Sequence, residues 1–99
     1  QEFDVPSHFT FAVGNPNPFR KSTRISYVLP SRMQVCLNVY DLSGRLVRTL
    51  VNEIQPPGLY NTEWHGSDNL RRKCPSGVYF VQLTTGTEYS ATRKLLLVR

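Results

Sequence analysis

The sequence contains no long apolar run, and seven prolines and six glycines interrupt its 99 residues. A membrane-spanning helix needs about 20 consecutive apolar residues, so none is predicted. Proline and glycine disfavour helix interiors, and their spread therefore argues for many short connections. The chain starts without an initiator methionine and without the charged-then-apolar pattern of a signal peptide. We therefore expect it to be a processed piece of a larger parent protein.

Cysteine is scarce, and no catalytic or metal-binding spacing is visible. Cys36 and Cys74 permit one disulfide but cannot alone bind zinc tetrahedrally, and free thiols are the favoured prediction. Cys74 and Ser76 have no base near them in the sequence that would activate a nucleophile. Neither His8 nor His65 has a carboxylate immediately beside it, so solvated histidines are expected. The sequence therefore predicts no enzyme, no metal and no cofactor.

Basic residues outnumber acidic ones, twelve to seven, for a net charge of +5. They occur in small scattered groups and do not alternate with aromatic residues, as they do in strands that bind single-stranded nucleic acid. No recognition helix is visible either. The sequence predicts no nucleic-acid partner and places most of these charges on solvated strand faces. A weak attraction to anionic polysaccharide or lipopolysaccharide is the alternative.

Apolar and polar residues alternate along most of the chain, which is typical of strands with one buried face. A helix over residues 45–53 would be short and rich in valine and threonine, and we reject it. The segment from Leu95 to Val98 is continuously apolar, as expected of a strand covered on both faces. The expected strands cover residues 9–13, 23–29, 34–40, 47–51, 59–64, 78–84 and 89–98.

Seven short strands separated by turn residues predict an all-β fold, an antiparallel immunoglobulin-like β-sandwich. Residues 1–8 are expected to be a linker or N-terminal arm, and residues 9–99 the sandwich. The polar segment from Trp64 to Ser76 is expected to join its flanking strands as a β-hairpin. A strand at the end of the chain could also offer unpaired backbone groups to a partner sheet.

Turn positions hold three polar residues, Asp41, Asp68 and Asn69, that resemble calcium ligands only superficially. Their spacing lacks the alternating oxygen donors of calcium loops, so we expect them to cap the backbone amides of their own turns. Trp64 and the tyrosines could form a sugar-stacking platform if exposed. A carbohydrate-binding or spacer module of an extracellular enzyme is therefore the alternative function.

Several motifs follow one another in a specific order and together resemble one known family. They are Asn15-Pro16-Asn17-Pro18-Phe19, Thr23–Pro30, Val39–Val47, Pro57–Tyr60, Trp64, Pro75–Tyr79 and Lys94–Leu97. Over residues 6–99 the chain resembles the C-terminal sorting domain of type IX (Por) secretion cargo. That family is related to the immunoglobulin-like domain of the flagellar hook-capping protein.

The resemblance implies a non-catalytic tail of a secreted multidomain protein, recognised by the outer-membrane secretion machinery. It implies a secreted or cell-surface location reached through the periplasm. In many members a sortase-like protease removes the tail and joins the upstream cargo domain to an anionic lipopolysaccharide. By position, the recognition signals fall on Gly77, Val78 and Tyr79, and on Lys94, Leu95, Leu96 and Leu97.

The chain departs from this family's pattern at two positions of the segment after Trp64. His65 stands where the family usually has aspartate, which removes a turn-capping carboxylate. Arg71 stands where the family usually has glycine. Because arginine disfavours positive φ, we expect the turn to avoid positive φ at this residue.

Overall fold

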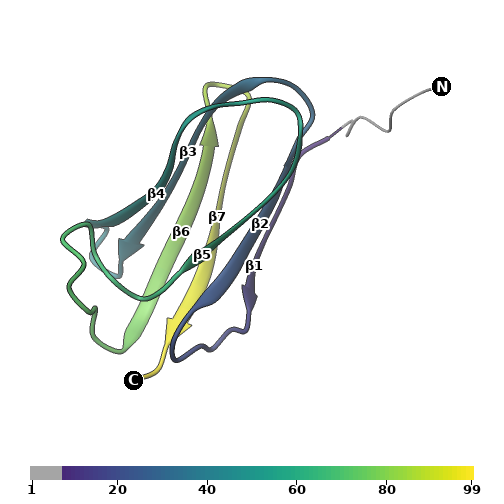
Figure 1. Ribbon diagram of the computed structural model, residues 1–99. Coiled ribbons are helices and arrows are strands. Elements are labelled where there is room, and N and C mark those ends of the chain that lie inside the picture. Colours follow the sequence, from purple (N-terminus) through teal and green to yellow (C-terminus); the bar gives the residue numbers. More distant parts are fainter. Residues whose placement is uncertain (1–7) are drawn as a thin grey trace.

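The computed structural model describes residues 8–99, which form two facing antiparallel sheets (Figure 1). One sheet has the strand order β1-β2-β5 and the other β4-β3-β6-β7. The prediction of an all-β sandwich of seven strands is confirmed. The strands are β1 (Thr10–Asn15), β2 (Thr23–Leu29), β3 (Met33–Asp41), β4 (Leu46–Gln55), β5 (Gly58–Trp64), β6 (Gly77–Thr85) and β7 (Tyr89–Leu97).

The expected linker, residues 1–8, lies outside the described residues except for His8. Within residues 8–99 no helix is long and apolar enough to cross a bilayer. The predicted alternation is confirmed on β3, where every second residue from Val35 to Val39 is fully buried. The aromatic side chains of Phe19, Trp64 and Tyr79 pack together within the same core.

The predicted hairpin between Trp64 and Gly77 is wrong, because β5 and β6 belong to different sheets. The ring of Trp64 on β5 contacts the ring of Tyr79 on β6, with centroids 5.1 Å apart. The buried faces of the two strands therefore meet across the core, and the strands do not pair edge to edge. Residues 65–76 instead form a crossover segment between the sheets at the lower end of the view in Figure 1.

The prediction that β7 is covered on both faces is also wrong. β7 is the edge strand of its sheet, and its buried face points toward the other sheet. Leu95 and Leu97 are fully buried, whereas Leu96 between them is 38% exposed. An apolar run can therefore alternate in burial when only one face of the strand has a second layer to pack against.

The outer edge of β7 is occupied near the end of the chain by the segment before β2. The backbone N–H of Phe19 donates to the carbonyl of Leu96, and the N–H of Val98 donates to the carbonyl of Phe19, both at 2.9 Å. The Asn17 side chain accepts from the Leu96 N–H at 2.9 Å and donates to the Lys94 carbonyl at 3.0 Å. The prediction of unpaired backbone groups is therefore wrong for this half of the strand. We call Asn17 and Phe19 the edge clamp.

Candidate functional site

The two segments predicted to carry recognition signals are paired with each other. In the antiparallel ladder of β6 and β7, Gly77 lies opposite Leu97, Val78 opposite Leu96, and Tyr79 opposite Leu95. The next pair is Phe80 and Lys94. Residues 14 to 20 positions apart in the sequence thus form one continuous stretch of sheet at the end where the chain finishes (Figure 1).

The pleat divides these residues between two faces. Tyr79, Leu95 and Leu97 are buried in the core, and the Tyr79 hydroxyl donates to the Pro75 carbonyl at 2.7 Å. Their neighbours on the strands lie on the outer face, since successive side chains point to opposite sides of a sheet. Of the predicted residues, only Val78, Lys94 and Leu96 therefore offer side chains to a partner.

Gly77 begins β6 with a φ of 156°, a conformation that residues with a side chain rarely adopt. A Cβ atom added there would meet nothing within 4 Å. The constraint at this position is therefore the backbone conformation and not a lack of space. Gly77 starts the strand that carries Val78 and Tyr79.

The outer face adds three residues that the sequence did not single out. Phe80 lies opposite both Tyr40 on β3 and Lys94 on β7, and Tyr40 lies opposite Leu46 on β4. The side chains of Tyr40, Leu46 and Phe80 are exposed or half-buried, and none belongs to the core cluster. No local pattern marks them, because only the strand register places them together. We define the outer patch as Tyr40, Leu46, Val78, Phe80, Lys94 and Leu96.

A groove of about 480 Å³ lies beside the outer patch, between the β3–β4 turn and the crossover segment. Two turns of the same design form its sides. The Asp41 carboxylate accepts the N–H groups of Ser43 and Arg45, both at 3.0 Å. The Asp68 carboxylate accepts those of Leu70 and Arg72, both at 2.9 Å. The prediction that these aspartates cap backbone amides is confirmed.

These hydrogen bonds set the ionisation of the two aspartates. The pKa of Asp41 is lowered, mainly by the Ser43 hydroxyl, and that of Asp68 mainly by the Arg72 N–H. Each carboxylate also lies near the arginine four residues later, Arg45 at 3.6 Å and Arg72 at 3.0 Å. Both aspartates therefore stay ionised and are neutralised within their own turns. The described residues hold no group of three or more His, Cys, Asp or Glu side chains suited to a metal.

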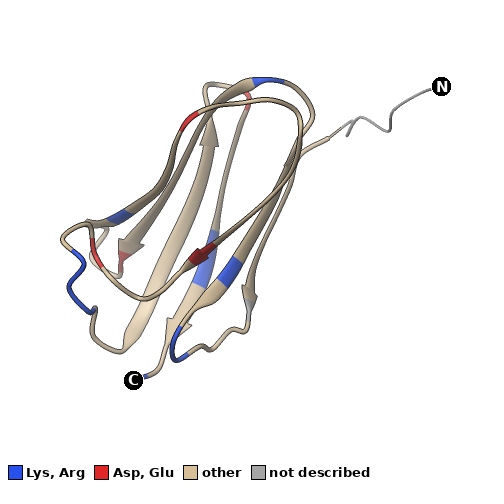
Figure 2. Cartoon of the chain, viewed as in Figure 1, with Lys and Arg blue, Asp and Glu red and all other residues tan. Residues whose placement is uncertain are grey.

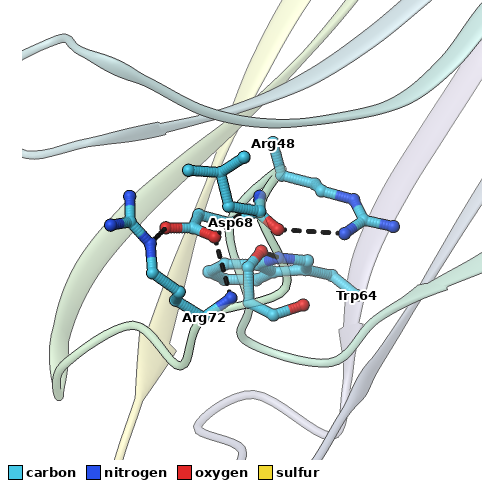
Figure 3. Close-up of polar contacts among 6 residues, drawn as sticks. Arg48, Trp64, Asp68 and Arg72 are labelled. Atoms are coloured by element: carbon cyan, nitrogen blue, oxygen red, sulfur yellow. Dashed lines mark hydrogen bonds and ion pairs between the residues drawn. The ribbon is translucent and has the colours of Figure 1, made fainter.

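The crossover segment is held against the core and the edge of β4 (Figure 3). Trp64 Nε1 donates to the Ser67 carbonyl at 2.9 Å, and Arg48 Nη1 donates to the Asp68 carbonyl at 3.1 Å. The Asn69 side chain accepts the Thr49 N–H of β4 at 3.0 Å, so it ties the segment to a neighbouring strand, whereas capping within its own turn was expected. The segment thus covers part of the exposed edge of β4, which removes a site for unwanted strand pairing.

Arg71 adopts a φ of 64°, so the prediction that its turn avoids positive φ is wrong. Gly44 occupies the matching place in the Asp41 turn, with a φ of 90°. In both turns the N–H of this residue donates to the aspartate carbonyl at 2.9 Å, which holds the conformation. The exposed Arg71 side chain avoids crowding, but its backbone is strained.

Replacing Arg71 by glycine is expected to raise the free energy of unfolding by about 0.5–1 kcal/mol, because the left-handed conformation suits glycine. Urea denaturation of the two proteins measures the difference. The matched control is Arg72→Gly, which removes the ion pair to Asp68 and is expected to destabilise. An Arg71→Gly protein no more stable than the parent contradicts the prediction.

The remaining predicted features lie apart from the groove or inside the core. Trp64 is only 1% exposed, so the proposed sugar platform on this residue is wrong. His65 is exposed as expected, but its Nε2 lies 3.4 Å from Oε1 of Glu63, a carboxylate two positions earlier in the sequence. Cys36 and Cys74 are free thiols, and burial raises the pKa of Cys74, which opposes thiolate chemistry.

Comparisons with known proteins agree with this geometry. The sequence profile of the FlgD Ig-like domain family matches residues 17–88. No curated protein sequence matches the chain. The dimeric latent PorU structure from Porphyromonas gingivalis is 19% identical with a TM-score of 0.73, over 95% of this chain and 10% of that one. PorZ, an essential bacterial surface component of the type-IX secretion system of the same organism, is 19% identical with a TM-score of 0.63, over 90% of this chain and 11% of that one.

FlgD from P. aeruginosa is 25% identical with a TM-score of 0.61, over 81% of this chain and 70% of that chain. The chain thus spans about a tenth of the PorU and PorZ chains and most of FlgD. The immunoglobulin-like character of the predicted sandwich is confirmed by these folds. The matched profile describes an Ig-like module and not a catalytic domain. The chain belongs to the FlgD Ig-like domain family.

Proposed function

We propose that the chain is a non-catalytic C-terminal sorting and anchoring domain of a secreted multidomain protein. Its partners are then the type IX outer-membrane machinery, a sortase-like protease and the upstream cargo domain of the same parent. The motif order in the sequence and the fold shared with PorU and PorZ support this proposal. The observation that carries it is the pairing of residues 77–79 with residues 95–97 on one edge of the sandwich.

The proposal assigns separate tasks to the two faces of this pairing. Val78, Lys94 and Leu96 on the outer face contact the machinery. Tyr79, Leu95 and Leu97 keep the two strands in place through the core, where all three are buried. Gly77 supplies the backbone conformation that starts β6. Recognition then depends on a folded surface and not on a linear tail.

The test is a fusion of residues 1–99 behind a reporter cargo, expressed in a bacterium with a type IX system. The double variant Val78→Ser, Leu96→Ser is expected to lower the surface-exposed cargo about tenfold or more, with the remainder in the periplasm. Loss of one buried aliphatic contact costs about 1.5 kcal/mol, and 1.4 kcal/mol is a factor of ten. Fractionation and immunoblotting measure the distribution.

The matched control is Gln82→Ala, Thr84→Ala, which alters the same face of β6 farther from the chain end. It is expected to leave secretion unchanged, and thermal melts verify that both variants fold. Deleting residues 90–99 is also expected to trap the cargo, but it removes Leu95 and Leu97 from the core and so confounds recognition with folding. Cargo that reaches the surface equally well in all variants contradicts the proposal.

The second candidate is an accessory or spacer module that contacts a neighbouring domain of an extracellular protein. The family match supports it, since FlgD from Xanthomonas campestris, a structure of similar fold, is a protein of hook capping in flagellar assembly. This candidate predicts normal secretion of the double variant but a lower melting temperature of the parent protein when the module is removed. Trp64 is buried and cannot belong to a carbohydrate-binding platform, whereas Tyr40, Tyr60 and Tyr89 are half-buried.

A further inference from the structure

Three leucines project into solvent around the groove between the β3–β4 turn and the crossover segment. Leu42 is 72% exposed, Leu70 is 71% exposed and Leu46 is 46% exposed. Leu46 and Leu70 line the groove, and Leu42 lines an adjoining hollow that shares Asp41, Arg45 and Tyr79 with it. Single exposed leucines are ordinary on protein surfaces, but a cluster around one concavity marks an interaction site.

The rim of the groove is basic. Arg45, Arg72 and Lys73 line it, and Arg71 precedes Arg72 in the crossover segment. Figure 2 colours Lys and Arg blue and shows them along this segment. The two aspartates nearby are already neutralised by their own turns, as described above. Within residues 8–99, neither Arg71 nor Lys73 forms an ion pair. Uncompensated positive charge therefore comes from Lys73, which lines the groove, and from Arg71 next to it, beside apolar side chains.

The groove is also held in shape before any partner arrives. Each side is a turn closed by hydrogen bonds to Asp41 or Asp68, and Asn69 fastens the crossover segment to β4 through two hydrogen bonds of 3.0 Å. Little conformational entropy is then lost when a ligand binds. The strained backbone of Arg71 fits this view, since strain often accumulates at binding sites.

We propose that this groove binds an acidic protein segment in which carboxylate and apolar side chains alternate. The carboxylates pair with Arg71 and Lys73, and the apolar side chains pack against Leu42, Leu46 and Leu70. A phosphate or an anionic glycan satisfies the charge but leaves the leucines uncovered, so a peptide is the occupant that uses both features. The proposal goes beyond the sorting role and does not depend on it, because a peptide held by the basic and leucine side chains does not need the secretion machinery. Lys94 and Leu96 line neither the groove nor the adjoining hollow, whereas Val78 lines the hollow.

Titration of the isotope-labelled 99-residue chain with a synthetic peptide of alternating leucine and aspartate tests the proposal. We expect shifts of the amide signals of Leu42, Leu46 and Leu70 that weaken as salt is added. A peptide of alternating serine and aspartate, one of leucine and lysine, and polyphosphate serve as comparisons. All three are expected to bind at least about tenfold more weakly, since each lacks the charge or the apolar contacts. Equal binding of polyphosphate, or no shift with the first peptide, overturns the proposal.

Variants separate a specific site from general attraction between charges. Arg71→Gly and Lys73→Ala are each expected to weaken binding about two- to fivefold, as exposed ion pairs do, and Leu70→Ser about tenfold. Arg71→Gly is informative because it is expected to stabilise the fold, so a loss of affinity cannot come from unfolding. The control Arg32→Ala removes one positive charge from the β2–β3 connection, at the other end of the strands. If Arg32→Ala weakens binding as much as Arg71→Gly, the site is not in the groove.

Discussion

Replacing Trp64 by alanine is expected to lower the free energy of unfolding by about 3–5 kcal/mol. The indole is 1% exposed, and its ring lies 5.6 Å from that of Phe19 and 5.1 Å from that of Tyr79. Its N–H also donates to the Ser67 carbonyl at 2.9 Å, which anchors the crossover segment. Small domains have a total stability of about 5–15 kcal/mol, so this single change removes a large part of it.

Urea denaturation followed by circular dichroism measures this loss. The control is Trp64→Phe, which keeps an aromatic ring in the core but gives up the hydrogen bond and part of the buried surface. It is expected to cost about 1–2 kcal/mol. If alanine costs no more than phenylalanine, the core does not depend on Trp64 as its packing indicates.

The second large effect is expected at the edge clamp. Phe19→Ala removes a side chain that is 2% exposed and packs on Trp64, at an expected cost of about 3–5 kcal/mol. Because the backbone of Phe19 pairs with Leu96 and Val98, the change is also expected to loosen the end of β7. Hydrogen exchange of the Leu96 and Val98 amides is then expected to accelerate more than that of β3, whose strand lies inside the sheet.

Two variants isolate the clamp from the core. Asn17→Ala leaves the core intact but removes two side-chain hydrogen bonds to β7, and it is expected to accelerate exchange at Leu96 with a loss of about 1–2 kcal/mol. Phe9→Ala removes a ring stacked at 4.4 Å on Tyr89, at the other end of β7, and is expected to leave Leu96 protected. Unchanged exchange at Leu96 in both clamp variants contradicts this account of the edge.

Local patterns in the sequence were sufficient to locate the seven strands, although β4 spans Leu46–Gln55 and the prediction covered only residues 47–51. The alternation at Val35, Leu37 and Val39 reports directly on burial, because side-chain direction in a strand depends only on position along it. The capping role of Asp41 and Asp68 is equally local, since each acceptor and its donors lie within four residues. Such features depend on short-range geometry that a sequence contains.

Features that depend on which strand lies beside which were predicted incorrectly. The expected hairpin after Trp64 failed because neighbouring strands in the sequence can pack across a core as well as pair within a sheet. The positive φ of Arg71 is an error of another kind: the feature is local, but the hydrogen bonds of its turn outweigh the preference of one residue. The partial exposure of Leu96 follows from the edge position of β7, which no local pattern reveals.

The amino-acid sequence by itself determined the all-β class and the approximate positions of the seven strands, and its resemblance to a known family supplied segments 77–79 and 94–97 as candidates for recognition. Only the tertiary structure decided that these segments pair, that Val78, Lys94 and Leu96 face outward, and that basic turns and exposed leucines surround one groove. The physical reason is the separation along the chain of the residues that produce each feature. Burial alternation and turn capping arise within a few residues, whereas register and sheet order arise from contacts between residues far apart in the chain.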